Sequence, residues 1–134
     1  MKTASAKAKG RRLAAQARDV ILSFIDGLSS DDVRVTPSGV NDVDLQLSPL
    51  AKEKFPFAVE CKNQEKLQLW KAWDQTEKRR TDGITPLLIH SRNRSSVLVT
   101  LCLDEFLAFW GAFEKLKWGL YQLDQKGNST KTQQ

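Results

Sequence analysis

The residues best suited to chemistry stand at the end of an apolar segment, where a carboxylate and an ammonium group are two positions apart. Residues 55–63 read FPFAVECKN, a run rich in strand-forming side chains. Because side chains alternate along a strand, Glu60 and Lys62 point to one face, while Cys61 between them points to the other. This pair could serve a divalent cation and a phosphate at the rim of a buried strand.

A second acid comes from the segment upstream. Residues 43–47 read VDLQL, in which apolar and polar side chains alternate. If this strand pairs with residues 55–63, Asp44 comes beside Glu60, and two acids with a lysine form a metal and phosphate site. Asp42 lies on the same strand face and competes for this position. We prefer Asp44 because apolar neighbours anchor it on both sides.

Hydrophobic periodicity predicts the elements that must position these residues. Helical spacing indicates one helix from Gly10 to about residue 28, another over residues 65–79, and a last one that Asp104 caps. Alternation and apolar runs predict strands over residues 33–36, 43–47, 55–63, 86–90 and 96–101. The order is α-β-β-β-α-β-β-α, which predicts an α/β fold with a mixed central sheet flanked by helices.

Length and composition bound the domain organisation. With 134 residues, 40% of them apolar, the chain is long enough for one domain with a single core. We expect a flexible basic arm over residues 1–8, one domain over residues 9–123 and a disordered polar tail over residues 124–134. The last helix is apolar around much of its girth and is expected to cover a sheet face. No signal peptide or membrane-length apolar run is visible, so we expect a cytoplasmic protein.

The charge of the chain favours a polyanionic partner. The net charge is +5, the pI is about 9.4, and the first eighteen residues hold six lysines and arginines and no acid. Further basic residues gather at Lys78–Arg80 and at Arg92 and Arg94. One histidine and two cysteines cannot form a Cys/His zinc cluster, and we expect both cysteines to be reduced.

Asp44, fifteen intervening residues and the E-C-K triplet at residues 60–62 resemble the motif of the PD-(D/E)xK nuclease superfamily. The resemblance is to its Holliday junction resolvase-like and phage-encoded endonucleases in particular. It runs from about Lys9 to about Leu107 and implies a restriction-endonuclease-like core. Residues 124–126 read DQK and also fit D-x-K, but no strand surrounds them. The strand and the order of elements therefore carry the resemblance, and the triplet alone does not.

The resemblance implies a role for each residue of the motif. Asp44 and Glu60 would bind Mg²⁺ or Mn²⁺, together with the backbone carbonyl of Cys61. Lys62 would orient the attacking water and offset the charge that develops on the phosphate. Two carboxylates and a phosphate favour its protonated form, so it would act as a cation and not as a general base. Gln75 would stand behind this lysine.

Relatives commonly carry a glutamate on the first helix, and Gln16, expected to face inward, is its equivalent here. Its amide could bind a metal ion or hold a water but brings no negative charge, so the number of metal ions stays open. A polar residue at a seam between helix and sheet is the alternative for Gln16. Contacts to the DNA backbone would come from Lys9, Arg11, Arg12, Ser38, Arg92 and Arg94.

Several functions remain open to such a chain. The resemblance favours a metal-dependent endonuclease that cuts branched DNA as a homodimer, in the host cytoplasm if the gene is phage-borne. A nicking or restriction-like nuclease would use the same residues. A catalytically silent DNA-binding module would use the same basic surface, and Gln16 in place of an acid favours it. The plainest alternative is an exposed ion pair between Glu60 and Lys62, which would contribute little to stability.

Overall fold

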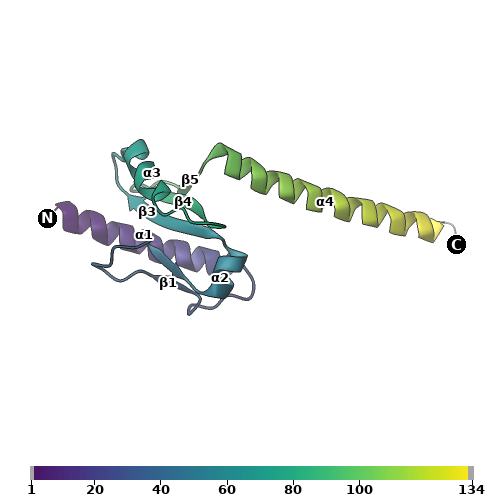
Figure 1. The fold of residues 1–134 in the computed structure, drawn as a ribbon, viewed down its shortest axis with the longest axis horizontal. Coiled ribbons are helices and arrows are strands. Elements are labelled where there is room, and N and C mark those ends of the chain that lie inside the picture. The colour runs from purple at the N-terminus through teal and green to yellow at the C-terminus, as the bar shows by residue number, and fades with distance from the viewer. Residues whose placement is uncertain (1, 133–134) are drawn as a thin grey trace. The chain divides into compact units, whose positions relative to one another are not determined.

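Helices alternate with strands along the described part of the chain (Figure 1). The computed structural model describes the backbone of residues 2–132 and the side chains of residues 5–128. The chain divides after Leu101 into two compact units, and the second unit consists of the last helix. The elements are α1 (Lys2–Phe24), β1 (Val33–Val35), β2 (Leu45–Leu47), α2 (Pro49–Lys54), β3 (Phe57–Asn63), α3 (Leu69–Glu77), β4 (Thr85–Ser91), β5 (Leu98–Thr100) and α4 (Leu103–Thr132).

A sheet of β3, β4 and β5 forms the centre of the first unit and lies between α1 and α3 (Figure 1). β3 runs parallel to β4, with Glu60 beside Leu88 and Lys62 beside His90, and β5 pairs antiparallel with β4. β1 and β2 form a separate antiparallel hairpin. One edge of β3 therefore has no strand ladder among the described residues. The predicted α/β class, with a small mixed sheet flanked by helices, is confirmed.

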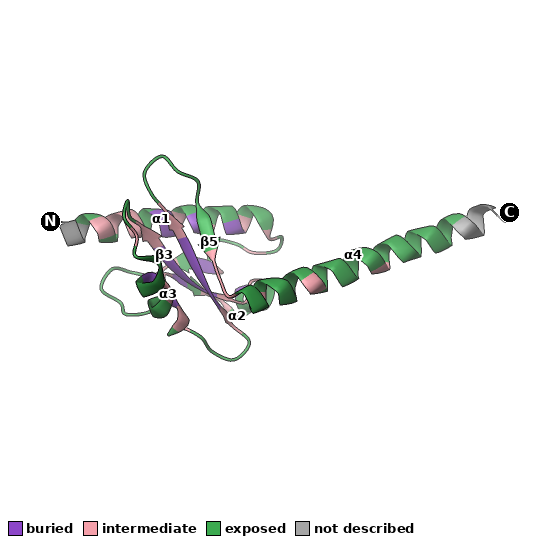
Figure 2. Ribbon diagram, turned by 90° about the horizontal axis from the view of Figure 1, so that it is seen from above, coloured by how far each residue is buried: buried purple, intermediate pink, exposed green. Residues whose placement is uncertain are grey.

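α1 covers one face of the sheet because its small and apolar residues recur on one side of the helix. The core below α1 contains Leu13, Ala14, Ala17, Ile21, Val59, Cys61, Leu87 and Ile89 (Figure 2). The opposite face of the sheet meets α3, whose buried residues are Ala72 and Thr76. Because Val59 and Cys61 belong to the core under α1, Glu60 points to the opposite face, as alternation predicted, and this is the face that meets α3.

The β1–β2 hairpin reaches the unpaired edge of β3 without forming a ladder with it. Thr36 closes the hairpin: its N–H donates to the carbonyl of Asp44 at 3.0 Å, and its hydroxyl donates to the carbonyl of Val43 at 2.5 Å. These carbonyls are thus turned toward β1. The prediction that a strand over residues 43–47 pairs with β3 is wrong. β2 begins only after Asp44 and pairs with β1, and Asp44 contacts the edge of β3 as a single residue.

Helix continues into both regions that were expected to be irregular. α1 begins at Lys2, so residues 2–8 are helical and not a flexible arm, since the alanines and lysines of this segment favour helix. α4 continues to Thr132, through most of the expected polar tail. No proline follows Pro86 in the sequence, and each added helical residue gains a backbone hydrogen bond. Residues 1, 133 and 134 lie outside the described part.

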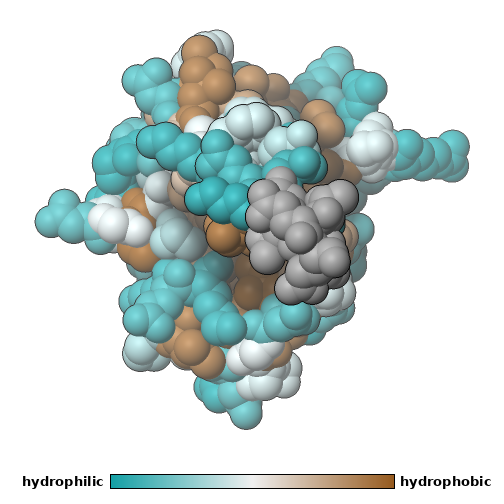
Figure 3. All heavy atoms as spheres, turned by 90° about the vertical axis from the view of Figure 1, so that its right-hand side faces the viewer, coloured by the Kyte–Doolittle hydropathy of each residue, from teal (hydrophilic) through white to brown (hydrophobic). Residues whose placement is uncertain are grey.

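α4 forms the second unit by itself and carries large apolar side chains along most of its length. A single helix has no neighbour within its unit against which to bury them. Figure 3 shows one face of the molecule, on which hydrophobic residues (brown) lie among hydrophilic ones (teal). None of the helices within residues 2–132 combines the length and the apolar character that a bilayer crossing requires. The expectation that α4 covers a sheet face stays a prediction.

Candidate active site

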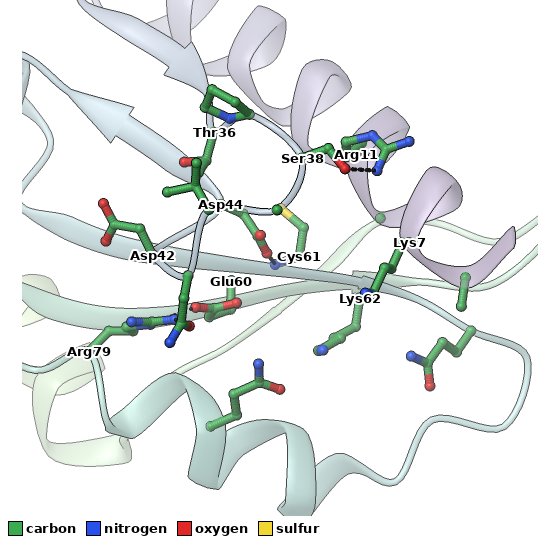
Figure 4. A pocket seen from close by; sticks show the side chains of 18 residues that line it. Lys7, Arg11, Thr36, Ser38, Asp42, Asp44, Glu60, Cys61, Lys62 and Arg79 are labelled. Atoms are coloured by element: carbon green, nitrogen blue, oxygen red, sulfur yellow. Dashed lines mark hydrogen bonds and ion pairs between the residues drawn. The ribbon is translucent and has the colours of Figure 1, made fainter. Parts of the chain in front are cut away.

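A cavity of about 500 Å³ opens at the unpaired edge of β3 (Figure 4). Its wall comes from the N-terminal half of α1, the loop over residues 36–42, the end of β3 and the face of α3 turned to the sheet. Sequence elements that are far apart in the chain therefore meet around one space. The predicted site residues that line it are Arg11, Ser38, Asp44, Glu60, Cys61, Lys62 and Gln75.

Asp44 is fixed against the edge of β3 by two hydrogen bonds. Its N–H donates to the carbonyl of Val59 at 2.8 Å, and its Oδ2 accepts from the N–H of Cys61 at 2.6 Å. Val59 and Cys61 flank Glu60 in the strand. The two bonds therefore hold the Asp44 carboxylate beside Glu60, although the two segments form no ladder (Figure 4).

Glu60 is buried and pairs with an arginine that follows α3. Only 4% of the Glu60 side chain is exposed, and its Oε1 accepts from Nε of Arg79 at 3.0 Å. Arg79 also donates through Nη2 to Oδ1 of Asn41 at 3.1 Å, which joins the loop over residues 36–42 to the end of α3. An exposed ion pair between Glu60 and Lys62 is therefore wrong as an account of these residues.

Two carboxylates held this close repel each other when both are ionised. Burial, followed by the charge of Asp44, raises the pKa of Glu60 to about 7, although the hydrogen bond from Arg79 acts in the opposite direction. Burial also raises the pKa of the Cys61 thiol, with smaller contributions from both carboxylates, so the thiol stays protonated. A cation between Asp44 and Glu60 would relieve the repulsion.

Lys62 and Gln75 complete the wall beside the carboxylates. Lys62 is half-buried, and it forms neither a hydrogen bond nor an ion pair with another described residue. Its ammonium group is therefore available to an anion that enters the cavity. Gln75 comes from α3 and lines the same space.

Arg11 and Ser38, both predicted to contact DNA, also contact each other. Nη1 of Arg11 donates to Oγ of Ser38 at 3.2 Å, which connects α1 to the loop over residues 36–42. Figure 4 shows this pair and Arg79 on different sides of the carboxylates. The loop is thus held at both ends of the cavity, by Arg11 at one and by Arg79 at the other.

Gln16 lies outside the cavity and is exposed, so the prediction that it faces inward is wrong. The buried stripe of α1 is centred on Ala14 and Ala17, and Gln16 falls beside this stripe. No acid comes from α1 in its place, because the helix lines the cavity with Ala6, Lys7, Gly10 and Arg11. The other predicted residues outside the cavity are Lys9, Arg12, Arg92 and Arg94.

Sequence reasoning missed two cations in the cavity, Lys7 and Arg79. Lys7 stands four residues before Arg11 on α1, about one helical turn away on the same face, so the helical period could have found it. Arg79 comes after the end of α3, where the helical period no longer applies.

The oxygen ligands present fit a small divalent cation. Mg²⁺ is commonly held by one or two carboxylates, with water and substrate phosphates as the other ligands. Asp44 and Glu60 supply two carboxylates, and the Cys61 carbonyl lies in the same wall, 3.5 Å from where a Cβ on Gly10 would stand. Among the described residues, no group of three or more His, Cys, Asp and Glu side chains could hold a metal ion, so Asp42 does not join the pair.

No protein-family model matches the chain, and neither a curated protein nor a solved structure does. The resemblance to the PD-(D/E)xK nucleases therefore stays a prediction from the motif. The geometry of the cavity is an observation that does not depend on the motif.

Proposed function

We propose that the chain is a metal-dependent endodeoxyribonuclease of the PD-(D/E)xK type, which hydrolyses phosphodiester bonds in DNA. The observation that carries the proposal is the meeting of Asp44, Glu60 and Lys62 in one cavity at the edge of β3. Lys7 and Arg11 in the same wall support a polyanionic substrate. The net charge of +5 supports it as well.

Asp44 and Glu60 would hold Mg²⁺ or Mn²⁺, with the Cys61 carbonyl as a further ligand. When bound, such an ion lowers the pKa of a water molecule and polarises a phosphate oxygen. The hydrogen bond from Cys61 N–H fixes the orientation of the Asp44 carboxylate. Arg79 holds Oε1 of Glu60 and leaves Oε2 free of this bond, so it acts as a positioning residue.

Lys62 would hold the phosphate that is cut and offset the negative charge that develops on it. Its ammonium group is suited to this role because it forms no ion pair with a described acid. The Gln75 amide would hold the attacking water beside it. Arg11 and Ser38 would bind backbone phosphates on the α1 side, without regard to base sequence.

Nicking of a supercoiled plasmid, with and without Mg²⁺, tests this proposal. We expect cleavage that requires the ion and falls by at least about 100-fold in Asp44→Asn and in Lys62→Ala. Asp74→Asn is the matched control, because Asp74 is an exposed carboxylate of α3 that does not line the cavity. Full activity in both site variants would contradict the proposal.

A catalytically silent DNA-binding module is the second candidate. It is favoured by α1, which lines the cavity with cations and no acid. Apart from Asp42, the cavity therefore has only the carboxylates of Asp44 and Glu60. Binding of a labelled duplex, without cleavage at any concentration of Mg²⁺ or Mn²⁺, would support the silent module. Ion-dependent nicking would exclude it.

We extend the proposal to branched DNA as the substrate and to a homodimer as the active form. A panel of four-way junction, flap, duplex and single-stranded substrates separates a junction resolvase from a nicking or restriction-like nuclease. Two cuts across one junction need two active sites, so we expect an apparent mass near twice the 15.2 kDa of one chain. A monomer at assay concentrations would remove the junction geometry. The cytoplasmic location belongs to this proposal too.

A further inference from the structure

A second hollow, of about 370 Å³, adjoins the carboxylate cavity at the start of α3. Lys62, Gln64 and Gln75 line both spaces, so the two are neighbours. Lys66 and Lys71 line only the second. We call this hollow the lysine groove, and its wall consists of Lys62, Gln64, Lys66, Leu67, Gln68, Lys71, Ala72 and Gln75.

The lysine groove holds three positive charges and no acid. Lys62, Lys66 and Lys71 form no ion pair with another described residue, whereas Arg80, which follows α3, pairs with Glu77. In the carboxylate cavity, by contrast, the cations share the wall with Asp42, Asp44 and Glu60. Positive charge is therefore compensated around the carboxylates and uncompensated beyond Lys62, which favours an anion in the groove.

The first turn of α3 adds hydrogen-bond donors to the same place. Gln68 is the N-cap residue and makes no side-chain cap, and the first turn contains no acid. Backbone N–H groups at the start of a helix have no partner within the helix, and the helix dipole there favours negative charge. Gln68 and Lys71 line the groove, so the positive end of this helix lies beside the three lysines.

We propose that the lysine groove binds a phosphate of the same DNA strand, next to the phosphate held at the carboxylate pair. The inference rests on the proposed nuclease function and adds the path of the strand to it. The strand runs from Asp44 and Glu60, past Lys62, to Lys66 and Lys71. Lys62 lines both spaces, so it lies between the two phosphates.

A third hollow gives this path a continuation. It has a volume of about 360 Å³ and shares Gln64 and Leu67 with the lysine groove. Arg92, which the sequence predicted as a DNA contact, lines it. Gln64 lines all three hollows, so a strand that follows them passes from the carboxylates to Arg92.

Two double variants of equal charge test the groove. Lys66→Ala with Lys71→Ala removes two charges from it, and Lys52→Ala with Lys78→Ala removes two exposed lysines that line a different hollow beside Asp42. Anisotropy of a labelled duplex is measured without divalent ions over a range of salt concentrations. We expect the groove variant to lose about tenfold in affinity, and the slope of log affinity against log salt concentration to fall by about 1 to 2. In the control, both the affinity and the slope should change less than half as much.

A neutral methylphosphonate, moved along the strand one phosphate at a time, locates the contact. We expect one position to weaken wild-type binding and to add nothing to the loss in the groove variant, because that contact is already gone. Equal losses in the two double variants, or a methylphosphonate effect that adds in full, would overturn the groove. A wild-type protein that binds no DNA would instead overturn the proposed function, so the two failures are distinguishable.

Discussion

Replacing Glu60 by glutamine should stabilise the protein at neutral and alkaline pH and remove the cation response. Glu60 is buried beside Asp44, which raises its pKa from 4.5 to about 7. One pKa unit corresponds to about 1.4 kcal/mol, so ionising Glu60 lowers the free energy of unfolding by about 3 kcal/mol. Glutamine has the same shape and no charge to desolvate.

The sign of the pH dependence follows from the raised pKa. Below pH 4.5, Glu60 is protonated in the folded and the unfolded chain, and its favourable contribution is complete. Between pH 4.5 and about 7 the unfolded chain releases the proton first, so wild-type stability falls as the pH rises. The stability difference between Glu60→Gln and the wild type should therefore grow by about 3 kcal/mol over this window and stay constant above it.

Urea unfolding at a series of pH values, in the presence of a chelator, measures this difference. Glu53→Gln is the control, because Glu53 is exposed on α2 and its charge stays in water. Added Mg²⁺ should then stabilise the wild type by about 3 kcal/mol at a hundred times its dissociation constant, and the Glu60 variant hardly at all. A difference that stays flat with pH would refute the buried, repelled carboxylate.

The remaining predictions concern the neighbours of this carboxylate. Arg79→Ala should lower the free energy of unfolding in urea by about 2 kcal/mol above the pKa of Glu60, because it leaves a buried carboxylate without its partner. An equal loss in acid, where Glu60 is neutral, would contradict this. Gly10→Ala should raise the midpoint of thermal unfolding, because a glycine within a helix costs up to about 1 kcal/mol and the added Cβ would lie at an ordinary 3.5 Å from the Cys61 carbonyl oxygen. A lowered midpoint would mean that α1 and β3 leave no room for this methyl group. Lys62→Arg should keep more nicking activity than Lys62→Ala, because it keeps the charge; equal loss would point to a role that only an ammonium group can fill.

Alternation was sufficient to predict which side chains of β3 share a face. The alternation of β3 separates Glu60 from Cys61, and the structure has Cys61 in the core under α1. The motif spacing led to Asp44, which is beside Glu60. The pattern did not show how Asp44 is held beside Glu60. Its carboxylate accepts a hydrogen bond from Cys61 N–H and its own N–H donates to the Val59 carbonyl, in place of a strand ladder.

Contacts between distant elements were beyond the sequence. Gln16 was assigned to an inward face, yet it is exposed, since the close approach of α1 to the sheet is set by small residues such as Ala14 and Ala17. Periodicity alone weights large apolar residues and passes over such small ones. The pairing of Arg79 with Glu60 joins the end of α3 to β3 and depends on how the helix returns to the sheet, which no local pattern specifies.

Titration calorimetry with Mn²⁺ tests the central claim most directly, because the claim is that Asp44 and Glu60 hold one divalent cation between them. We expect one site for each wild-type chain, lost in Asp44→Asn and in Glu60→Gln and kept in the exposed control Asp74→Asn. Unchanged Mn²⁺ binding in both site variants would show that the ion is held elsewhere, and the proposed nuclease would lose its metal centre.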